Sequence, residues 1–320
     1  MSSTSYQGDA YKIGNQFGYQ EYMIKRYIEM MGEEETKKLL HFNEQKLERI
    51  IRLNSLRESI PKIIQLLENK GVKLKNIEDL PEGKRVVKSP VPIGATPEYL
   101  NGYYMLQGKN SMYPSRVLNP RKGELIGDFA AAPGGKTTHL AQLMENEGII
   151  IASEISTNRC RILRSNLARM GVRNTIIMNM DSRDISSLKM EFDKVLLDAP
   201  CSGSGIIISD RSRKQSKSIE DIMNYHENQV SLLSEALNVV KQGGELVYCT
   251  CSLEPEENEF VLSEVLEKDI AKLIDIDLEG VSGMTYFEGR EINSEVKRAK
   301  RLYPHRTNGE GFFIAKMVKL

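Results

Sequence analysis

The segment at residues 128–137 reads DFAAAPGGKT, and its glycines and lysine are residue types that hold nucleotides. Its end, Gly135-Lys136-Thr137, is similar to the close of a phosphate-binding loop, whose backbone N–H groups and lysine bind a triphosphate. That pattern requires glycine at position 130, where this chain has Ala130. Residues 195–198 (VLLD) resemble the strand whose last aspartate binds magnesium in such enzymes. Two hypotheses are open: a nucleoside triphosphatase, or an enzyme whose glycine loop holds another nucleotide.

An acidic residue further along the chain separates these hypotheses. Gly134 and Gly135 follow a predicted strand and begin a predicted helix, so the backbone there can approach a ligand closely. A nucleoside site of this kind has an acid about 20 residues further on, which accepts hydrogen bonds from the ribose hydroxyls. Glu154 stands 20 positions after Gly134. A phosphate loop has no use for this acid, so the sequence favours a nucleoside cofactor. The alternative, an ordinary solvated carboxylate at Glu154, stays open.

The chain has four cysteines, Cys160, Cys201, Cys249 and Cys251. They are too few for a disulfide scaffold in 320 residues, and no two form a C-x-x-C pair. We interpret all four as reduced thiols. A buried cysteine is most often a small hydrophobic residue, and this is our interpretation of Cys160 and Cys249.

Short apolar runs alternate with longer amphipathic stretches from residue 124 onward. This alternation predicts an α/β fold, with a parallel sheet that helices cover on both faces. We expect strands at residues 124–129, 149–154, 174–179, 194–198, 245–250, 272–276 and 312–318. We expect helices near residues 136–145, 158–170, 219–240 and 255–267. The glycine loop then joins the first strand to the first helix, at the edge where such sheets bind ligands.

The residues before this sheet predict a smaller α+β domain. The first 17 are polar, and we expect them to be disordered or loosely docked. Helical periodicity covers residues 19–42, with a break at Gly32. We expect a strand at 48–56, a helix at 60–69 and a short strand at 85–88. The predicted division is a disordered segment at 1–17, an α+β domain at 18–115 and the domain of the large sheet at 116–320.

Basic and acidic residues balance, 44 against 44, so no overall field indicates a nucleic-acid partner. Three runs nevertheless hold lysine and arginine without any acid: residues 109–122, 211–217 and 297–306. Such runs are usually solvated faces, but two of them flank the motifs, which favours a rim that binds phosphates. The sequence has no apolar stretch that approaches 18 residues and no signal-peptide segment, so we expect a soluble, cytoplasmic protein that binds no membrane.

Three motifs, taken in order, resemble one enzyme family. Residues 128–137 (DFAAAPGGKT), 198–205 (DAPCSGSG) and 248–252 (YCTCS) are similar to the motifs of the Sun-type (Nop2/Sun) RNA cytosine-5 methyltransferases. The resemblance extends from about residue 100 to the end of the sequence. It implies a Rossmann-like sheet that binds S-adenosylmethionine, preceded by an RRM-like RNA-binding domain of the kind common in archaeal members. The family usually has cysteine where this chain has Ala130.

The resemblance also implies a role for each motif residue. Carbon 5 of cytosine is a poor nucleophile, so the family first adds a cysteine thiolate to carbon 6. Cys251 is implied as that nucleophile, and Cys201 as the cysteine that assists proton removal and product release. Asp198 is implied to bind the edge of the cytosine, and Lys136 to reach the base. The residues implied in cofactor binding are Ala130, Ala131, Ala132, Pro133, Gly134, Gly135, Lys136, Glu154, Arg159, Asp181 and Asp198.

The function that we expect is methylation of carbon 5 of cytosine in RNA. Transfer RNA is the preferred substrate, because the compact chain resembles archaeal tRNA members, and ribosomal RNA is the alternative. A catalytically silent RNA-binding protein with the same fold is the rival from another class, although the presence of both Cys201 and Cys251 argues against it. An amino-methyltransferase is a third alternative, but such sites present N-P-P-Y or D-P-P-Y where this chain has DAPC. We expect a monomer that needs no metal.

Overall fold

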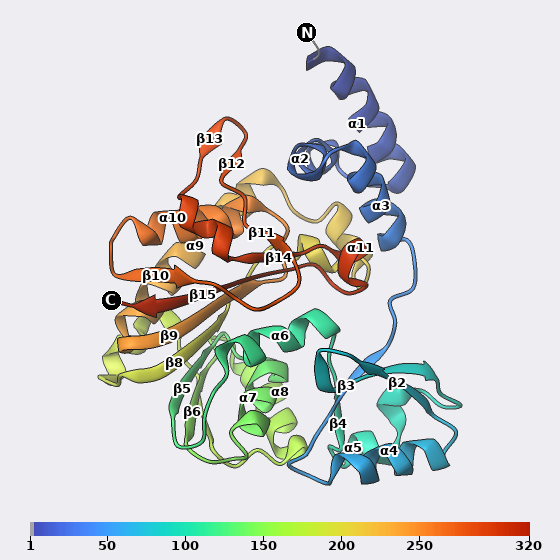
Figure 1. Cartoon of the computed structure of the whole chain (residues 1–320), viewed down its shortest axis with the longest axis vertical. Helices are drawn as coiled ribbons and strands as arrows, with labels where there is room; N and C mark the ends of the chain where they lie inside the picture. Colours follow the sequence, from blue (N-terminus) through green and yellow to red (C-terminus); the bar gives the residue numbers. More distant parts are fainter. Residues whose placement is uncertain (1–2) are drawn as a thin grey trace.

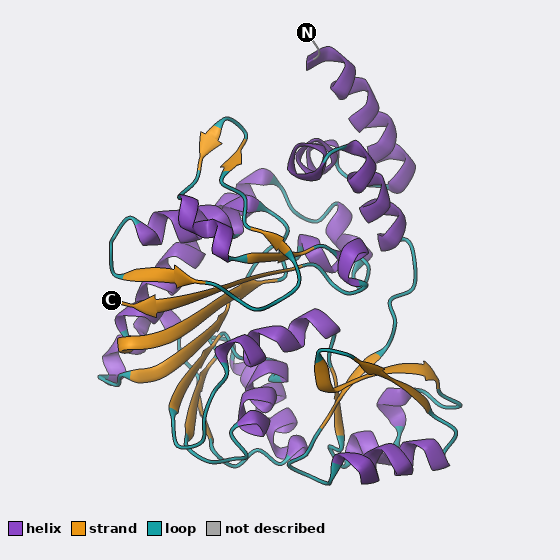
Figure 2. Ribbon diagram, viewed as in Figure 1, coloured by secondary structure: helices purple, strands orange, loops and turns teal. Residues whose placement is uncertain are grey.

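The computed structural model describes residues 3–320. Its main parts are a nine-stranded sheet with its helices, a separate four-stranded sheet, and a group of three N-terminal helices (Figures 1 and 2). A small hairpin of β12 (Tyr286–Phe287) and β13 (Arg290–Glu291) projects from the C-terminal half.

Five parallel strands form one side of the large sheet, in the spatial order β7-β6-β5-β8-β9, with β7 at the edge. Their bounds are β5 Leu125–Phe129, β6 Ile149–Ser153, β7 Thr175–Met178, β8 Phe192–Asp198 and β9 Val240–Thr250. The helices in this part are α6 Lys109–Leu118, α7 Gly135–Leu143, α8 Thr157–Met170, α9 Ile219–Asn238 and α10 Glu259–Leu266. All five strands lie where the sequence predicts them.

The prediction of a purely parallel sheet is wrong on one side. Beyond β9 the sheet continues with antiparallel strands, in the order β9-β15-β14-β11, and β10 also pairs with β15. Their bounds are β10 Ala271–Ile274, β11 Val281–Ser282, β14 Lys300–Leu302 and β15 Phe312–Lys319. Only residues 303–311, which include the one-turn helix α11 (Pro304–Thr307), separate β14 from β15. A parallel pair requires a longer crossover, so this short connection imposes antiparallel pairing.

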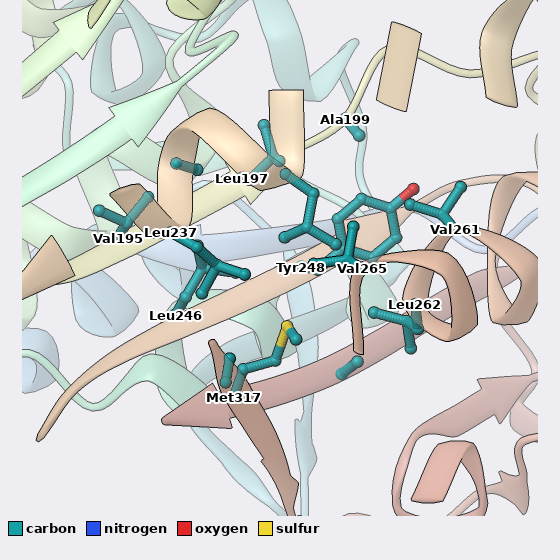
Figure 3. Close-up of a cluster of buried hydrophobic side chains, with 14 of the residues drawn as sticks. Val195, Leu197, Ala199, Leu237, Leu246, Tyr248, Val261, Leu262, Val265 and Met317 are labelled. Atoms are coloured by element: carbon teal, nitrogen blue, oxygen red, sulfur yellow. The ribbon is translucent and has the colours of Figure 1, made fainter. Parts of the chain in front are cut away.

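Side chains on the central strands alternate between two cores, as the period of a strand requires. Leu197 and Tyr248 face a core that α9 and α10 cover, and Figure 3 shows Val261, Leu262 and Val265 of α10 packing there. Leu196 and Cys249, the next residues along, face a second core that α6 and α7 cover. Helices therefore cover both faces of the sheet, as predicted, and Cys249 belongs to the second core.

The small sheet has the chain order of a ferredoxin-like βαββαβ unit. Its elements are β1 Ile50–Leu53, α4 Ile60–Asn69, β2 Lys73–Ile77, β3 Leu80–Lys88, the one-turn helix α5 Pro97–Leu100 and β4 Tyr104–Leu106, and its spatial order is β2-β3-β1-β4. The sequence predicts β1, α4 and part of β3 but not the two edge strands. β2 is lysine-rich and largely exposed and β4 has three residues, so neither has a clear alternation of apolar side chains.

A buried arginine joins the small sheet to the large one. Arg52 of β1 is 0% exposed. Its guanidinium donates to Thr138 Oγ1 on α7 at 2.6 Å, to Gln107 Oε1 at 2.8 Å, and to the side chain of Gln142. Three polar partners compensate the loss of water around this cation, so the contact fixes the small sheet against α7.

Three helices precede the small sheet but pack elsewhere: α1 (Ser3–Phe17), α2 (Glu21–Met31) and α3 (Glu33–Asn43). Their apolar side chains share a core with Ile207, Leu253 and Tyr303 of the large domain. The sequence predicts disorder for residues 1–17, whereas residues 3–17 form α1, because Ala10 and Ile13 are buried in this core; residues 1–2 lie outside the described chain. The predicted break at Gly32 lies between α2 and α3. A long connection then leads to β1 (Figure 1).

Candidate active site

The predicted site residues follow the carboxyl ends of the five parallel strands. In spatial order across the sheet they are Asp181 after β7, Glu154 after β6, the glycine loop after β5, Asp198 at the end of β8 and Cys251 after β9. The carboxyl edge of an open α/β sheet is where such folds bind ligands.

The glycine loop turns the chain sharply from β5 into α7. Gly134 has φ +101°, a conformation that side chains disfavour, and a Cβ there would lie 2.8 Å from Leu163 Cδ1 of α8. Ala130 also has a positive φ, of 61°. The loop therefore needs glycine at position 134 both for its backbone angle and for close packing.

A cavity of about 190 Å³ lies against this loop. Its lining from the loop is Ala130, Ala131, Ala132, Pro133, Gly135 and Lys136. Asp128, Asp198, Glu310 and residues 105–108 complete the wall, so a segment that leads out of the small sheet forms part of it.

Glu154 is only 1% exposed, so the solvated alternative does not hold. Its Oε1 accepts a hydrogen bond from the Ser156 N–H at 3.0 Å, whereas Oε2 accepts none and has the guanidinium of Arg159 3.3 Å away. Arg159 also donates to the Ala132 carbonyl at 2.6 Å, which links this acid to the glycine loop. A buried carboxylate oxygen without a hydrogen bond matches the ribose-binding role that the sequence suggests.

Asp181 has a different environment. It caps the short helix at Ser182–Leu188, and its carboxylate accepts from the backbone and side chain of Arg183. The hydrogen bond from Arg183 lowers the pKa of Asp181. The residue stands at the sheet edge but does not line the cavity, and Arg183 occupies its carboxylate.

Lys136 and Asp198 both line the cavity and meet there, with 2.7 Å between Nζ and Oδ2. Lys136 also donates to Ser111 Oγ at 3.3 Å, and its amine lies 5.0 Å from the centre of the Phe312 ring. Burial opposes the charge on Lys136, but the carboxylate of Asp198 outweighs it and raises the pKa of the amine. The second oxygen of Asp198 accepts from the thiol of Cys249 at 3.4 Å.

The two motif cysteines are adjacent, with their sulfur atoms 3.3 Å apart. Both are partly exposed, whereas Cys160 and Cys249 are buried, as predicted for packing residues. The hydrogen bond with Cys251, together with burial, raises the pKa of Cys201 well above its usual range. Cys201 therefore remains a thiol that can donate to the sulfur of Cys251.

Two acidic residues of the cavity were not predicted from the sequence. Asp128 is fully buried; Thr137 Oγ1 donates to its Oδ2 at 2.5 Å, Oδ1 has no partner, and burial raises its pKa to about 7. Its position at the strand end, directly before the glycine loop, is a signal that could have found it. Burial also raises the pKa of Glu310, against the influence of Lys136. Glu310 reaches the cavity from the start of β15, which no local pattern indicates.

The acid-free runs acquire acidic partners when the chain folds. Lys214 lies 2.5 Å and Arg211 3.4 Å from the carboxylate of Glu44, beside α3, and Arg213 pairs with Asp210. In the run at 297–306 the ion pairs are Arg298–Asp275, Arg301–Glu259 and Arg306–Glu35. In the run at 109–122, Arg116 pairs with Glu82 and Lys122 with Glu145. These cations fix parts of the protein to one another, so the three runs do not form one free rim.

Cations also line a groove of about 940 Å³ beside α6. Lys109, Tyr113 and Arg116 face it from one side of α6, at helical spacing, and Lys75 and Arg85 face it from the small sheet. Acids, including Asp79 and Glu279, line it as well. The same helix carries Ser111, which contacts Lys136, so the groove and the cavity lie close together.

Within residues 3–320, no helix is both long and apolar enough to cross a membrane. Over the same residues, no three His, Cys, Asp or Glu side chains gather as they would around a metal ion.

The fold, together with the comparisons, places the chain in the Rossmann-like methyltransferase fold class. Within that class the chain belongs to the family described as 16S rRNA methyltransferase RsmB/F, whose family model matches residues 115–318. A model for the ferredoxin-like domain of RsmF/B-like methyltransferases matches residues 19–93. The predicted family and fold class are thereby confirmed.

Curated relatives include enzymes for both kinds of RNA. The chain is 41% identical over 313 residues to the 28S rRNA (cytosine-C(5))-methyltransferase of Mus musculus, covering 96% of this chain and 40% of the relative. It is 36% identical to the tRNA (cytosine(49)-C(5))-methyltransferase of Pyrococcus abyssi, covering 93% of this chain and 95% of the relative. The chain spans about half or less of the length of the eukaryotic rRNA relatives that it matches.

Two solved structures are similar over nearly the whole chain. A methyltransferase homolog protein from Pyrococcus horikoshii has a TM-score of 0.89 at 40% identity and covers 100% of both chains. NSun6 from Pyrococcus horikoshii, solved with SFG, has a TM-score of 0.81 at 28% identity and covers 92% of this chain and 96% of its own.

Proposed function

We propose that this protein methylates carbon 5 of cytosine in RNA with S-adenosylmethionine, through a covalent bond between Cys251 and carbon 6. The observation that carries the proposal is the pair of thiols at 3.3 Å, on the same sheet edge as the Lys136–Asp198 ion pair and the cavity. A packing role for the two cysteines would require neither their partial exposure nor their place at this edge.

The residues present fit the proposed cofactor. Glu154 Oε2 is buried without a hydrogen bond and suits a ribose hydroxyl, and Gly135 lines the cavity without a side chain. We assign cofactor binding to residues 130–136 with Glu154, Arg159, Asp181 and Asp198; for Asp181 this requires that Arg183 share or release its carboxylate. When bound, S-adenosylmethionine supplies an electrophilic methyl group for carbon 5.

Each remaining residue has a task on the base. The Cys251 thiolate adds to carbon 6, which makes carbon 5 enamine-like and nucleophilic. Asp198 and Lys136 face the cytosine edge, where a hydrogen bond to the ring stabilises the electron-rich adduct. Cys201, which burial and its hydrogen bond keep as a thiol, first donates to the Cys251 thiolate. After methylation, Cys201 must lose this proton to solvent before its thiolate can take the carbon 5 proton, and Cys251 then leaves carbon 6 as a thiolate.

Transfer RNA is our proposed substrate, because the chain covers 95% of the Pyrococcus abyssi tRNA enzyme and so matches it in overall length. Ribosomal RNA is the second candidate, because the identity to the mouse 28S rRNA enzyme is higher, at 41%. The RNA backbone is assigned to the groove beside α6. A monomeric, cytoplasmic enzyme is part of the proposal.

The test is transfer of a radiolabelled methyl group to purified tRNA and rRNA, followed by digestion to nucleosides. We expect label in 5-methylcytidine from tRNA, and none with Cys251→Ala. Label in rRNA alone would favour the second candidate. No label in either RNA, with RNA binding intact, would favour the silent RNA-binding protein. Bisulfite sequencing of RNA from cells with and without the protein then locates the cytosine.

A further inference from the structure

Glu257 is a buried carboxylate that the mechanism above does not use. It ends the short helix at Pro255–Glu257 and is 0% exposed. Its Oε1 accepts from the Ser202 N–H at 2.7 Å, and its Oε2 accepts from the hydroxyls of Ser202, at 2.5 Å, and Ser252. Ser202 follows Cys201 and Ser252 follows Cys251, so one carboxylate bridges the two cysteine loops.

The two loops depend on this bridge to different degrees. On the Cys251 side, the Ser252 N–H donates to Thr250 Oγ1 at 3.1 Å and Asn258 donates to the Ser252 carbonyl at 3.0 Å. Both contacts persist without Glu257. On the Cys201 side, Arg213 donates to the Ser202 carbonyl at 2.7 Å, but Glu257 accepts from both the N–H and the hydroxyl of Ser202. Loss of the carboxylate would therefore displace Cys201 more than Cys251.

We propose that Glu257 is a positioning residue, whose bridging carboxylate holds the thiol of Cys201 against that of Cys251. This inference rests on the proposed function, in which Cys251 attacks the base and Cys201 acts when product is released. A misplaced Cys201 leaves the attack possible but slows the later step, so a Glu257 variant should partly reproduce the behaviour of Cys201→Ala.

The energetic cost of this carboxylate supports the assignment. Burial raises the pKa of Glu257 to about 7, against the hydrogen bonds from Ser202 and Ser252. Gln229 also donates to it, at 3.3 Å. Burial of an acid that remains partly ionised at neutral pH costs free energy, which an apolar residue in the same place would not cost. Its hydrogen-bond geometry, which ties two functional loops together, gives a reason for its presence.

The matched control is Glu256, the preceding residue. It is also buried, at 7% exposure, but its carboxylate pairs with Arg26 of α2. Glu256→Gln therefore removes a buried charge from the same helix without breaking either hydrogen bond to Ser202. Glu257→Gln keeps the shape of the side chain and removes the charge, and Ser202→Ala removes the hydroxyl alone; Ser202→Ala serves if Glu257→Gln does not fold.

The first measurement is turnover together with the fraction of RNA bound covalently to protein on a denaturing gel. For Glu257→Gln we expect kcat to fall roughly 10- to 100-fold, the scale of a small misplacement of a reacting group, with the bound fraction raised several-fold. The ratio kcat/KM for RNA should be unchanged, because the slowed step follows methyl transfer. Glu256→Gln should leave both kcat and the bound fraction at wild-type values. A fall in kcat without covalent complex, in conditions where Cys201→Ala does accumulate one, would overturn the proposal, and so would an equal rise of the bound fraction in Glu256→Gln.

The second measurement needs no RNA and so separates this inference from the proposed function. Diamide, a diazene oxidant, accepts two electrons and two protons from the Cys201 and Cys251 thiols, which join as a disulfide that mass spectrometry detects. We expect this reaction to be roughly tenfold slower in Glu257→Gln than in the wild type or Glu256→Gln. An unchanged rate would overturn the positioning role. If Cys201→Ala accumulates no covalent complex while the diamide rates differ as expected, the covalent mechanism fails and the positioning role stands.

Discussion

The amine of Lys136 lies 2.7 Å from the carboxylate of Asp198, although the glycine loop and the DAPC motif are separate in the sequence. β5 and β8 are neighbours in the sheet, with Phe129 opposite Leu197, so the segments that follow the two strands start side by side. Each side chain is the counter-charge of the other at the cavity wall. Removal of one charge therefore leaves the other without its partner and lowers the stability of the fold. Removal of both charges leaves no unpaired charge.

For this pair, we predict that Lys136→Met is less stable than the double variant Lys136→Met/Asp198→Asn. The single change leaves a partly buried carboxylate without its cation, which we expect to cost roughly 1–2 kcal/mol, because a third of the Asp198 side chain is exposed and solvent screens the loss. Urea unfolding measures the difference. Both variants should lack methyl transfer; activity in the double variant would contradict the assigned roles.

The cysteines should separate by phenotype. Cys251→Ala removes the nucleophile, so neither methylation nor a covalent RNA complex should form. Cys201→Ala leaves the attack intact and blocks release, so a denaturant-resistant complex should accumulate. Cys160→Ala is the control, because the Cys160 thiol donates to a backbone carbonyl, that of Glu154, whereas the Cys249 thiol contacts the Asp198 carboxylate. Cys160→Ala should lose roughly 1 kcal/mol of stability and keep its methyl transfer. A complex with Cys251→Ala instead of Cys201→Ala would reverse the assignment.

Glu154 should contribute to cofactor affinity. We expect Glu154→Gln to weaken S-adenosylmethionine binding by roughly 1.5–3 kcal/mol in calorimetry, the scale of hydrogen bonds to a charged group. Glu147→Gln, which changes an exposed acid paired with Lys122, should leave the affinity unchanged. Magnesium ATP should not compete; competition at similar affinity would restore the triphosphatase hypothesis.

The pKa of Asp128 predicts a pH dependence of stability. Burial raises this pKa from 3.8 to about 7, so the folded protein holds the proton more tightly than the unfolded chain does. The wild type should therefore lose stability as the pH rises through this window, by up to about 1.4 kcal/mol per pH unit. Asp128→Asn lacks this loss, so its stability relative to the wild type should rise between pH 5 and pH 8. Urea unfolding of the cofactor-free protein checks this, and an equal difference at both pH values would refute it.

Salt dependence should distinguish the groove from the predicted rim. Lys75→Gln with Lys109→Gln removes two cations that line the groove, so the slope of log affinity against log salt should flatten by about 1.4 if each contacts one phosphate. Arg211→Gln with Lys214→Gln removes cations already held by Glu44 and should leave that slope nearly unchanged. The reverse result would show that the run at 211–217 is the RNA contact.

The sequence predicts those features that depend on the spacing of residues within a short stretch of the chain. Glu154 could be found because a ribose acid follows the glycine loop at a set spacing, and the central strands because apolar runs mark them. The contact between Lys136 and Asp198, in contrast, depends on which strands pair. Glu310 comes from the antiparallel side of the sheet, and Glu44 meets Arg211 only after α3 docks. Such pairings join distant parts of the chain, and no pattern within a short window contains them.

The chain leaves the body that holds the large sheet after α3 and rejoins it at α6, so the small sheet is attached at both of its ends and by Arg52 between them. Topologically it is an inserted module, and three anchors leave it little freedom to swing. On the proposed function, the small sheet would then hold any RNA segment bound to it at a fixed distance from the cysteine pair. An enzyme built in this way selects its target by the three-dimensional shape of a folded RNA more than by the nucleotide sequence that flanks the cytosine.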